Sequence, residues 1–151
     1  MGYTHYFQQQ REVTDKEWTA IMTDAANIIQ AAINSGIVLV REYDDQKEKP
    51  YVGLDLIAFN GLGENGHETF YLPKEMEAGR GTDKYRFNFC KTARKPYDDA
   101  VAAILLSMNH HAPGAWDSGS DGGRDDWARG IELYEVATGR EQVKFPSWLE
   151  S

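Results

Sequence analysis

The fold class follows from one stretch, residues 14–36, which reads TDKEWTAIMTDAANIIQAAINSG. Thr14 and Glu17 have the spacing of a capping box, in which two side chains satisfy backbone N–H groups at the start of a helix. Behind them apolar residues repeat at helical intervals, and Gly36 follows the last of them as a stop signal. The stretch therefore predicts an amphipathic helix over about residues 15–35, whose apolar face a second layer of structure must cover.

The segments around this helix have the composition and alternation of β-strands. The expected strands are residues 2–9, 37–43, 51–59, 68–72 and 85–90, with a further short one at about 115–118. A charged turn and Pro50 separate the second strand from the third, so we expect these two to form a hairpin. Because the connections are short, the strands predict a mainly antiparallel sheet of about five strands.

Two more helices are expected in the second half of the chain. Pro96 suits the first position of a helix that ends near His110 or His111. A cap at Ser120 or Asp121 would begin a third helix that ends before Gly139, although Gly130 inside it is unfavourable. The prediction is an α+β fold with two to three helices packed on the sheet, in a single domain of residues 1–151.

Composition restricts the classes of function. The chain has 16 Lys and Arg against 24 Asp and Glu, and its net charge of −8 disfavours general nucleic-acid binding. No stretch approaches the roughly 18 to 20 apolar residues of a membrane span, and the amino terminus lacks a signal-peptide pattern. We therefore expect a cytoplasmic protein without membrane contact. The one cysteine, Cys90, predicts a reduced, half-buried thiol.

A basic island stands out in this acidic chain. Its cations are Lys84, Arg86, Lys91, Arg94 and Lys95, with no acidic residue between them. The second half of the island leaves a predicted strand and enters a predicted helix, where free backbone amides and the positive helix end favour an anion. This corner predicts a phosphate or carboxylate site. The alternative is that the same cations pair with nearby surface carboxylates.

Other motifs match known sites only in part. His67-x-Thr69 is half of the signature of two-histidine phosphodiesterases, which leaves a metal-independent phosphodiesterase using His67 as an alternative. The glycine-rich residues 60–66 lack the Lys-Ser/Thr ending of a phosphate-binding P-loop. Residues 117–128 lack the final carboxylate of a calcium loop. We expect no metal and no cofactor.

Four segments together resemble a family of uncharacterised phage and prophage proteins. They are Met1-Gly2-Tyr3-Thr4-His5-Tyr6, Phe59-Asn60-Gly61 with His67-Glu68-Thr69-Phe70, the run Phe89-Cys90-Lys91-Thr92-Ala93-Arg94-Lys95-Pro96-Tyr97-Asp98, and Ser120-Asp121-Gly122. Phe7 departs from the tryptophan of similar sequences. The resemblance implies a viral or prophage setting, hence the host cell cytoplasm, and carries no established activity. Small phage proteins often bind or degrade a signalling nucleotide, or occupy a host protein.

The leading hypothesis is a non-enzymatic protein that binds a small anionic, nucleotide-derived ligand and so counters a host system. The expected ligand-binding residues are Tyr3, His5, Asn60, His67, Lys91, Thr92, Arg94 and Asp121. The alternative is an acidic protein-interaction module that inhibits a basic host protein through its acidic surface and carboxy-terminal aromatics. Among those aromatics, Trp148 either docks back on the domain or meets the partner. The oligomeric state is open.

Overall fold

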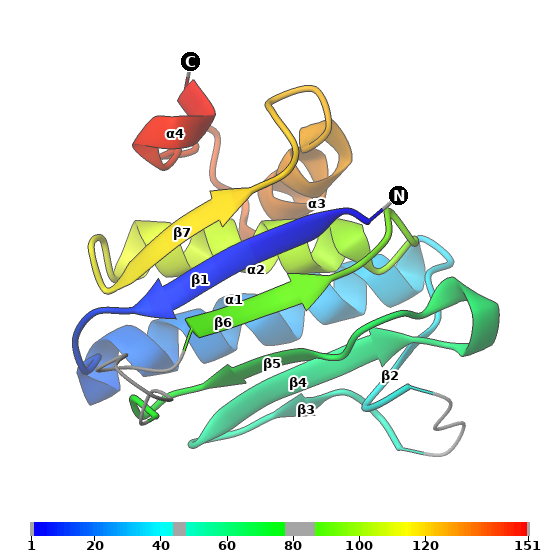
Figure 1. The fold of residues 1–151 in the computed structure, drawn as a ribbon, viewed down its shortest axis with the longest axis horizontal. Coiled ribbons are helices and arrows are strands. Elements are labelled where there is room, and N and C mark those ends of the chain that lie inside the picture. Colours follow the sequence, from blue (N-terminus) through cyan, green and yellow to red (C-terminus); the bar gives the residue numbers. More distant parts are fainter. Residues whose placement is uncertain (1, 44–47, 78–86, 151) are drawn as a thin grey trace.

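The computed structural model describes residues 2–43, 48–77 and 87–150. The strands form one layer, and helices α1 (Asp15–Asn34) and α2 (Asp98–His111) lie behind it (Figure 1). Helix α3 (Ala128–Thr138) packs against both α1 and α2, and a short helix α4 (Ser147–Glu150) closes the described chain. The predicted α+β class with antiparallel strands is confirmed.

The strands belong to two antiparallel sheets and not to the expected single sheet. In the first, β1 (Thr4–Gln9) lies between β6 (Phe87–Lys91) and β7 (Trp116–Ser120). In the second, β4 (Leu56–Gly61) pairs with β5 (Phe70–Pro73) and with the two short strands β2 (Leu39–Val40) and β3 (Tyr51–Val52). The two sheets meet where the Glu68 N–H donates to the Lys91 carbonyl at 3.1 Å.

Helix α1 begins as its sequence predicts. The Glu17 N–H donates to Thr14 Oγ1 at 3.1 Å, and the Thr14 N–H donates to Glu17 Oε1 at 2.9 Å. Arg11 donates to both oxygens of Glu17, and these bonds lower the pKa of Glu17 to about 2. Past the other end of the helix, Gly36 has a φ of +101°, which favours glycine.

Replacing Thr14 with alanine is expected to lower the free energy of unfolding by about 1 kcal/mol, because the Glu17 N–H loses its partner. Urea denaturation measures this, with Thr14→Ser as the control that keeps the hydroxyl. The depressed pKa of Glu17 adds stability above its ordinary value of 4.5, and that contribution is lost as the pH falls towards about 2. If the alanine variant were as stable as the serine variant, the Thr14 hydroxyl would not stabilise the start of the helix as described.

The predictions of a strand over residues 51–59 and of a hairpin between the second and third strands are wrong. The expected strand 51–59 is broken into β3 and β4 by a turn in which the Gly53 N–H donates to the Leu56 carbonyl at 2.9 Å. A Cβ on Gly53 would lie 2.6 Å from the Tyr51 hydroxyl oxygen, so a larger residue there would displace the Tyr51 ring. The hairpin therefore joins β3 to β4, while β2 pairs with the far end of β4.

The predicted start of the third helix is also wrong, because α3 begins at Ala128. Ser120 does not cap it, because Ser120 is the last residue of β7 and pairs with His5 of β1. Gly130 has a packing reason: a Cβ there would lie 2.7 Å from the Cβ of Ala102 on α2. The glycine thus lets α3 approach α2 closely, and the helix ends at Gly139 in the left-handed conformation, as expected.

The core lies between the strand layer and the helices. The rings of Phe7 and Phe59 both pack on Phe70, with centroids 5.4 and 5.3 Å apart. Cys90 is fully buried and not half-buried, and burial raises the pKa of its thiol. Of the described helices, none is long and apolar enough to cross a membrane.

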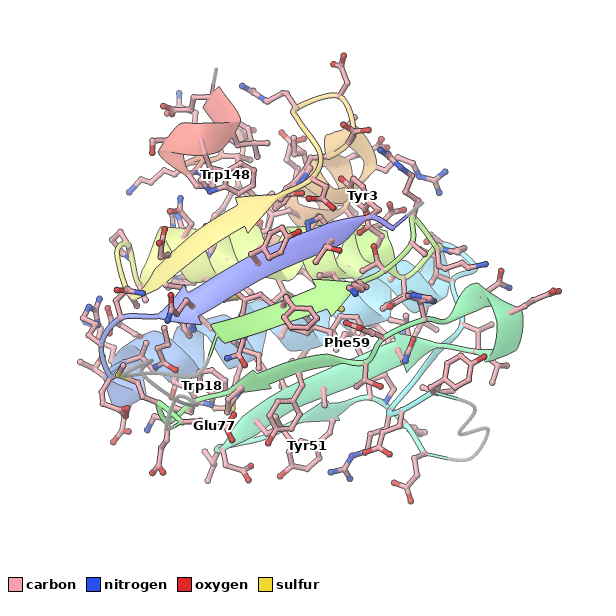
Figure 2. All side chains as sticks on the ribbon, in the orientation of Figure 1. Tyr3, Trp18, Tyr51, Phe59, Glu77 and Trp148 are labelled. Atoms are coloured by element: carbon pink, nitrogen blue, oxygen red, sulfur yellow. The ribbon has the colours of Figure 1, made fainter. Side chains whose placement is uncertain are left out.

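The carboxy-terminal aromatics dock back on the domain. Trp148, labelled in Figure 2 near β7, packs its ring on Trp127 with a centroid distance of 5.5 Å. Its Nε1 donates to Ser118 Oγ at 3.1 Å. Of the two alternatives for Trp148, the structure shows docking on the domain.

Candidate functional site

Three of the four quoted segments meet at the amino-terminal end of β1, where Figure 2 labels Tyr3. The Tyr3 carbonyl accepts from the N–H groups of Thr92 and Ala93, at 3.0 and 3.3 Å. Asp121 bonds to Thr4 twice, through its own N–H and through its carboxylate, which accepts the Thr4 N–H at 3.0 Å. The structure therefore brings Tyr3, Thr92 and Asp121 together, as predicted.

A buried polar cluster lies beneath this end of β1. His5 is fully buried, and its ring lies 5.2 Å, centroid to centroid, from Tyr3 and from Trp127. His5 Nε2 lies 2.6 Å from Asp98 Oδ1, and His5 Nδ1 lies 2.9 Å from Ser120 Oγ. The chain just after β6 is tied to the same carboxylate, because Thr92 Oγ1 donates to Asp98 Oδ1 at 2.6 Å.

Ser120, His5 and Asp98 are the residue types of a catalytic triad, but their bonding is that of a structural cluster. Ser120 Oγ already accepts from the Gly122 N–H at 3.0 Å and from Trp127 Nε1 at 3.2 Å. Its hydroxyl therefore donates to His5 Nδ1, and His5 Nε2–H donates to Asp98. Both lone pairs of Ser120 Oγ are engaged, so the hydroxyl is poorly placed to attack a substrate.

The chain leaves β6 through a strained turn. Ala93 and Arg94 have positive φ values of 53° and 59°, and the Lys95 N–H donates to the Thr92 carbonyl at 3.0 Å. Two such residues make a type I′ turn, which favours Asn-Gly because side chains clash in the left-handed region. That conformation costs roughly 1–2 kcal/mol per residue. The bonds of Thr92 to Tyr3 and Asp98 hold the turn against this cost.

The turn places Arg94 over Tyr3. The Arg94 guanidinium carbon lies 4.1 Å from the centroid of the Tyr3 ring, and Nη1 donates to Asp126 Oδ1 at 2.7 Å. The Arg94 side chain is still 60% exposed. Tyr3 is buried, burial raises its pKa to about 12, and its hydroxyl has no hydrogen-bond partner within the described residues. Gly122 is required here, since a Cβ would lie 2.0 Å from that hydroxyl.

A hollow of about 210 Å³ adjoins Arg94 at the start of α2. Its lining consists of Arg94, Lys95, Pro96, Asp98, Asp99, Asp126 and Arg129. Arg129 Nε donates to Asp99 Oδ2 at 3.1 Å, and Arg94 pairs with Asp126. Lys95 is the cation of the lining that forms no ion pair with a described residue. Within the basic corner Arg94 thus pairs with a surface carboxylate, as the alternative hypothesis expects, while the anion site stays a prediction.

Most backbone amides around the turn are already engaged within the chain. The N–H groups of Thr92 and Ala93 donate to Tyr3, and that of Lys95 donates to Thr92. The Asp98 N–H donates in turn to the Lys95 carbonyl at 2.8 Å. An anion at this corner would be held by side chains rather than by these amides.

Of the eight predicted site residues, Arg94 is the one that lines the hollow. Asn60 is buried and holds its own loop together, donating to the His67 carbonyl and to Thr69 Oγ1 at 3.0 Å each. His67 and Lys91 are exposed, and they lie near each other because Glu68, which follows His67, bonds to Lys91 through the backbone and through its carboxylate. Lys84 and Arg86 of the basic island lie outside the described residues.

The histidines do not form the pair that a two-histidine phosphodiesterase needs. His5 is buried in its cluster, while the rings of His110 and His111 contact each other edge to face at the end of α2, with a centroid distance of 4.7 Å. Exposed His67 therefore has no histidine facing it in the part of the chain that the structure describes. That activity stays a prediction without support from the geometry.

The sequence interpretation missed Asp98, Ser120, Asp126 and Trp127. Asp98 lies at the start of the helix expected after Pro96, and its partner His5 is 93 residues away in the chain. No periodicity signals such a contact; only the correct pairing of β1 with β7 would have placed Ser120 beside His5.

No group of three or more His, Cys, Asp or Glu in the described ranges is arranged to hold a metal ion. Comparisons of the chain with protein-family models, curated proteins and solved structures gave no match.

Proposed function

We propose that this protein binds a small anionic ligand of nucleotide type, and that Arg94 is the main contact. One observation carries the proposal: a turn with two strained residues holds the Arg94 guanidinium over the buried ring of Tyr3. Backbone strain of this kind persists where the surroundings enforce it, and it gathers at ligand clamps and active sites. The strain fixes an arginine whose side chain remains largely exposed.

The geometry of Arg94 suits a ligand with a planar ring and a negative group. One face of the guanidinium lies on Tyr3, while 60% of the side chain is open to solvent. Guanidinium planes stack on nucleobases, and their N–H forks bind phosphate with charge-assisted hydrogen bonds. A nucleotide would place its base on the outer face of Arg94 and its phosphate towards Lys95.

The carboxylates of the hollow compete with such a ligand for the arginines, so the ligand can bind only if these ion pairs are weak. The Arg94–Asp126 and Arg129–Asp99 pairs join largely exposed arginines, and exposed ion pairs contribute only about 0–1 kcal/mol. Burial also raises the pKa of Asp99, which weakens its hold on a cation. A phosphate group with charge-assisted bonds to Arg94, Lys95 and Arg129 can displace these weak pairs.

Binding without turnover fits the rest of the site. Ser120 Oγ has its lone pairs engaged and His5 is buried, so neither is presented to a ligand in the hollow. In a phage setting, such a protein would act by sequestering a host signalling nucleotide.

Isothermal titration calorimetry against cyclic and ADP-ribose-type nucleotides tests the proposal, with inorganic phosphate and adenosine as the separated halves of the ligand. We expect saturable binding of at least one nucleotide, weaker binding of either half, and an unchanged nucleotide when the mixture is analysed by chromatography. If no nucleotide gives saturable heat at high micromolar concentration, the proposal fails. If the nucleotide is converted, the protein is an enzyme and not a binding protein.

A further inference from the structure

The strand layer has one face that the helices leave uncovered (Figure 1). An antiparallel sheet of this kind normally alternates apolar residues towards the helices with polar residues towards water. Here the outward positions of three strands are aromatic. On β6, Cys90 is buried and Phe89 is 45% exposed; on β5, Leu72 is buried and Tyr71 is 43% exposed. On β1, Tyr6 alternates with buried neighbours and is partly exposed.

We refer to these outward residues, Tyr6, Phe89 and Tyr71, as the aromatic row. Tyr6 is directly opposite Phe89 in the pairing of β1 with β6. Strand β5 contacts β6 on its other side, where the Glu68 N–H donates to the Lys91 carbonyl. Apolar side chains that stay exposed together on one face of a protein mark interaction sites.

The charges beside the aromatic row select a cationic partner. Asp121 accepts a hydrogen bond from the Tyr6 hydroxyl at 3.2 Å. Asp117 is exposed on β7 and pairs with Gln8, the next outward residue of β1. Within the chain, Lys91 already places its Nζ 5.8 Å from the centroid of Phe89, which is a cation over a ring of the row. A nucleic acid does not suit this face, because these carboxylates and the net charge of −8 repel its phosphates.

We propose that the aromatic row docks an arginine-rich extended segment of a partner protein. Guanidinium groups stack on aromatic rings and also bind carboxylates through their N–H forks, so arginine suits both features of this face. The alternative surface expected from the sequence, the carboxy-terminal aromatics, is used internally by the docking of Trp148. Phe89 and Tyr71 do not line the hollow at Arg94, so this inference stands apart from the nucleotide proposal.

The probe is a fluorescent peptide of alternating arginine and serine, with a lysine–serine peptide of equal length as the comparison. Fluorescence anisotropy at physiological salt measures binding to the wild type, to Phe89→Ser/Tyr71→Ser, and to Leu54→Ser/Val136→Ser. Leu54 and Val136 are apolar residues exposed elsewhere, by 80% and 71%, and serve as the matched control. We expect the arginine peptide to bind more tightly than the lysine peptide, and the aromatic double variant to lose about tenfold in affinity.

Three results would overturn the inference: no binding of the arginine peptide to the wild type, equal affinity in the aromatic double variant, or equal losses in the control variant. Equal binding of the lysine peptide, abolished by salt in every variant, would show general attraction to an acidic protein instead. Circular dichroism melting confirms that each variant is folded. Nucleotide binding should be unchanged in Phe89→Ser/Tyr71→Ser, so failure of one proposal is separable from failure of the other.

Discussion

Replacing Arg140 with alanine is expected to destabilise the protein by about 3 to 5 kcal/mol, the range for removing one partner of a buried ion pair. Arg140 Nη1 donates to Asp24 Oδ2 at 2.6 Å, and Ser107 Oγ donates to the same oxygen at 2.7 Å. His111 Nε2 lies 2.9 Å from it. Asp24 is only 5% exposed, so the variant leaves a carboxylate without its counter-charge.

The pH dependence of this loss has a definite sign. Burial by itself would raise the pKa of Asp24, but the hydrogen bonds from Arg140, Ser107 and His111 outweigh burial and lower it. In the wild type this pair adds stability above the ordinary pKa of Asp24, and that stability is lost as the pH falls below it. Without Arg140, burial dominates and favours the protonated acid. The difference between the two proteins should therefore be largest at neutral pH and shrink in acid.

Urea unfolding across this pH range measures the effect. The matched control is Arg129→Ala, which removes an arginine that is 79% exposed from its pair with Asp99 and should cost less than about 1 kcal/mol. Arg140→Lys keeps the charge and should recover part of the stability. If Arg140→Ala is no less stable than Arg129→Ala, the buried pair does not contribute as described.

The second large effect is expected at His5. His5→Ala should cost about 3 to 5 kcal/mol, because it opens a cavity and removes the bonds that Asp98 and Ser120 make to the imidazole. The matched control is His67→Ala, an exposed histidine, which should stay within about 0.5 kcal/mol of the wild type. Thermal melting of both variants separates them. Equal melting temperatures would contradict the buried cluster that supports the turn at Arg94.

Local signals in the sequence predicted the local parts of this fold. The capping box of Thr14 and Glu17 and the positive φ of Gly139 are formed by neighbours in the chain, so spacing alone reveals them. The alternation of β1 likewise placed His5 in a sheet. The turn at Gly53 was missed because apolar residues lie on both sides of Gly53 and Asp55, so the whole stretch has the composition of one strand.

The site depended on contacts that no local signal carries. Ala93 and Arg94 are neither glycine nor asparagine, so nothing in the sequence indicates that both adopt the left-handed conformation. The carboxylate that pairs with Arg94 is Asp126, 32 residues away in the chain, so spacing could not identify it. The basic corner and Arg94 could be found from composition, but the charge balance of the hollow required the fold.

Parallel binding and melting measurements on Arg94→Ala test the central claim most directly. The matched control is Arg41→Ala, which removes another arginine from a tyrosine ring, that of Tyr51, at 4.7 Å. Because the Arg94–Asp126 pair is exposed, we expect Arg94→Ala to melt like the control and to bind nucleotide about 1.5 to 3 kcal/mol more weakly than the wild type, the range for hydrogen bonds to charged groups. An Arg94→Ala protein that binds nucleotide as tightly as Arg41→Ala, or that unfolds readily, would contradict the claim that Arg94 is a ligand contact.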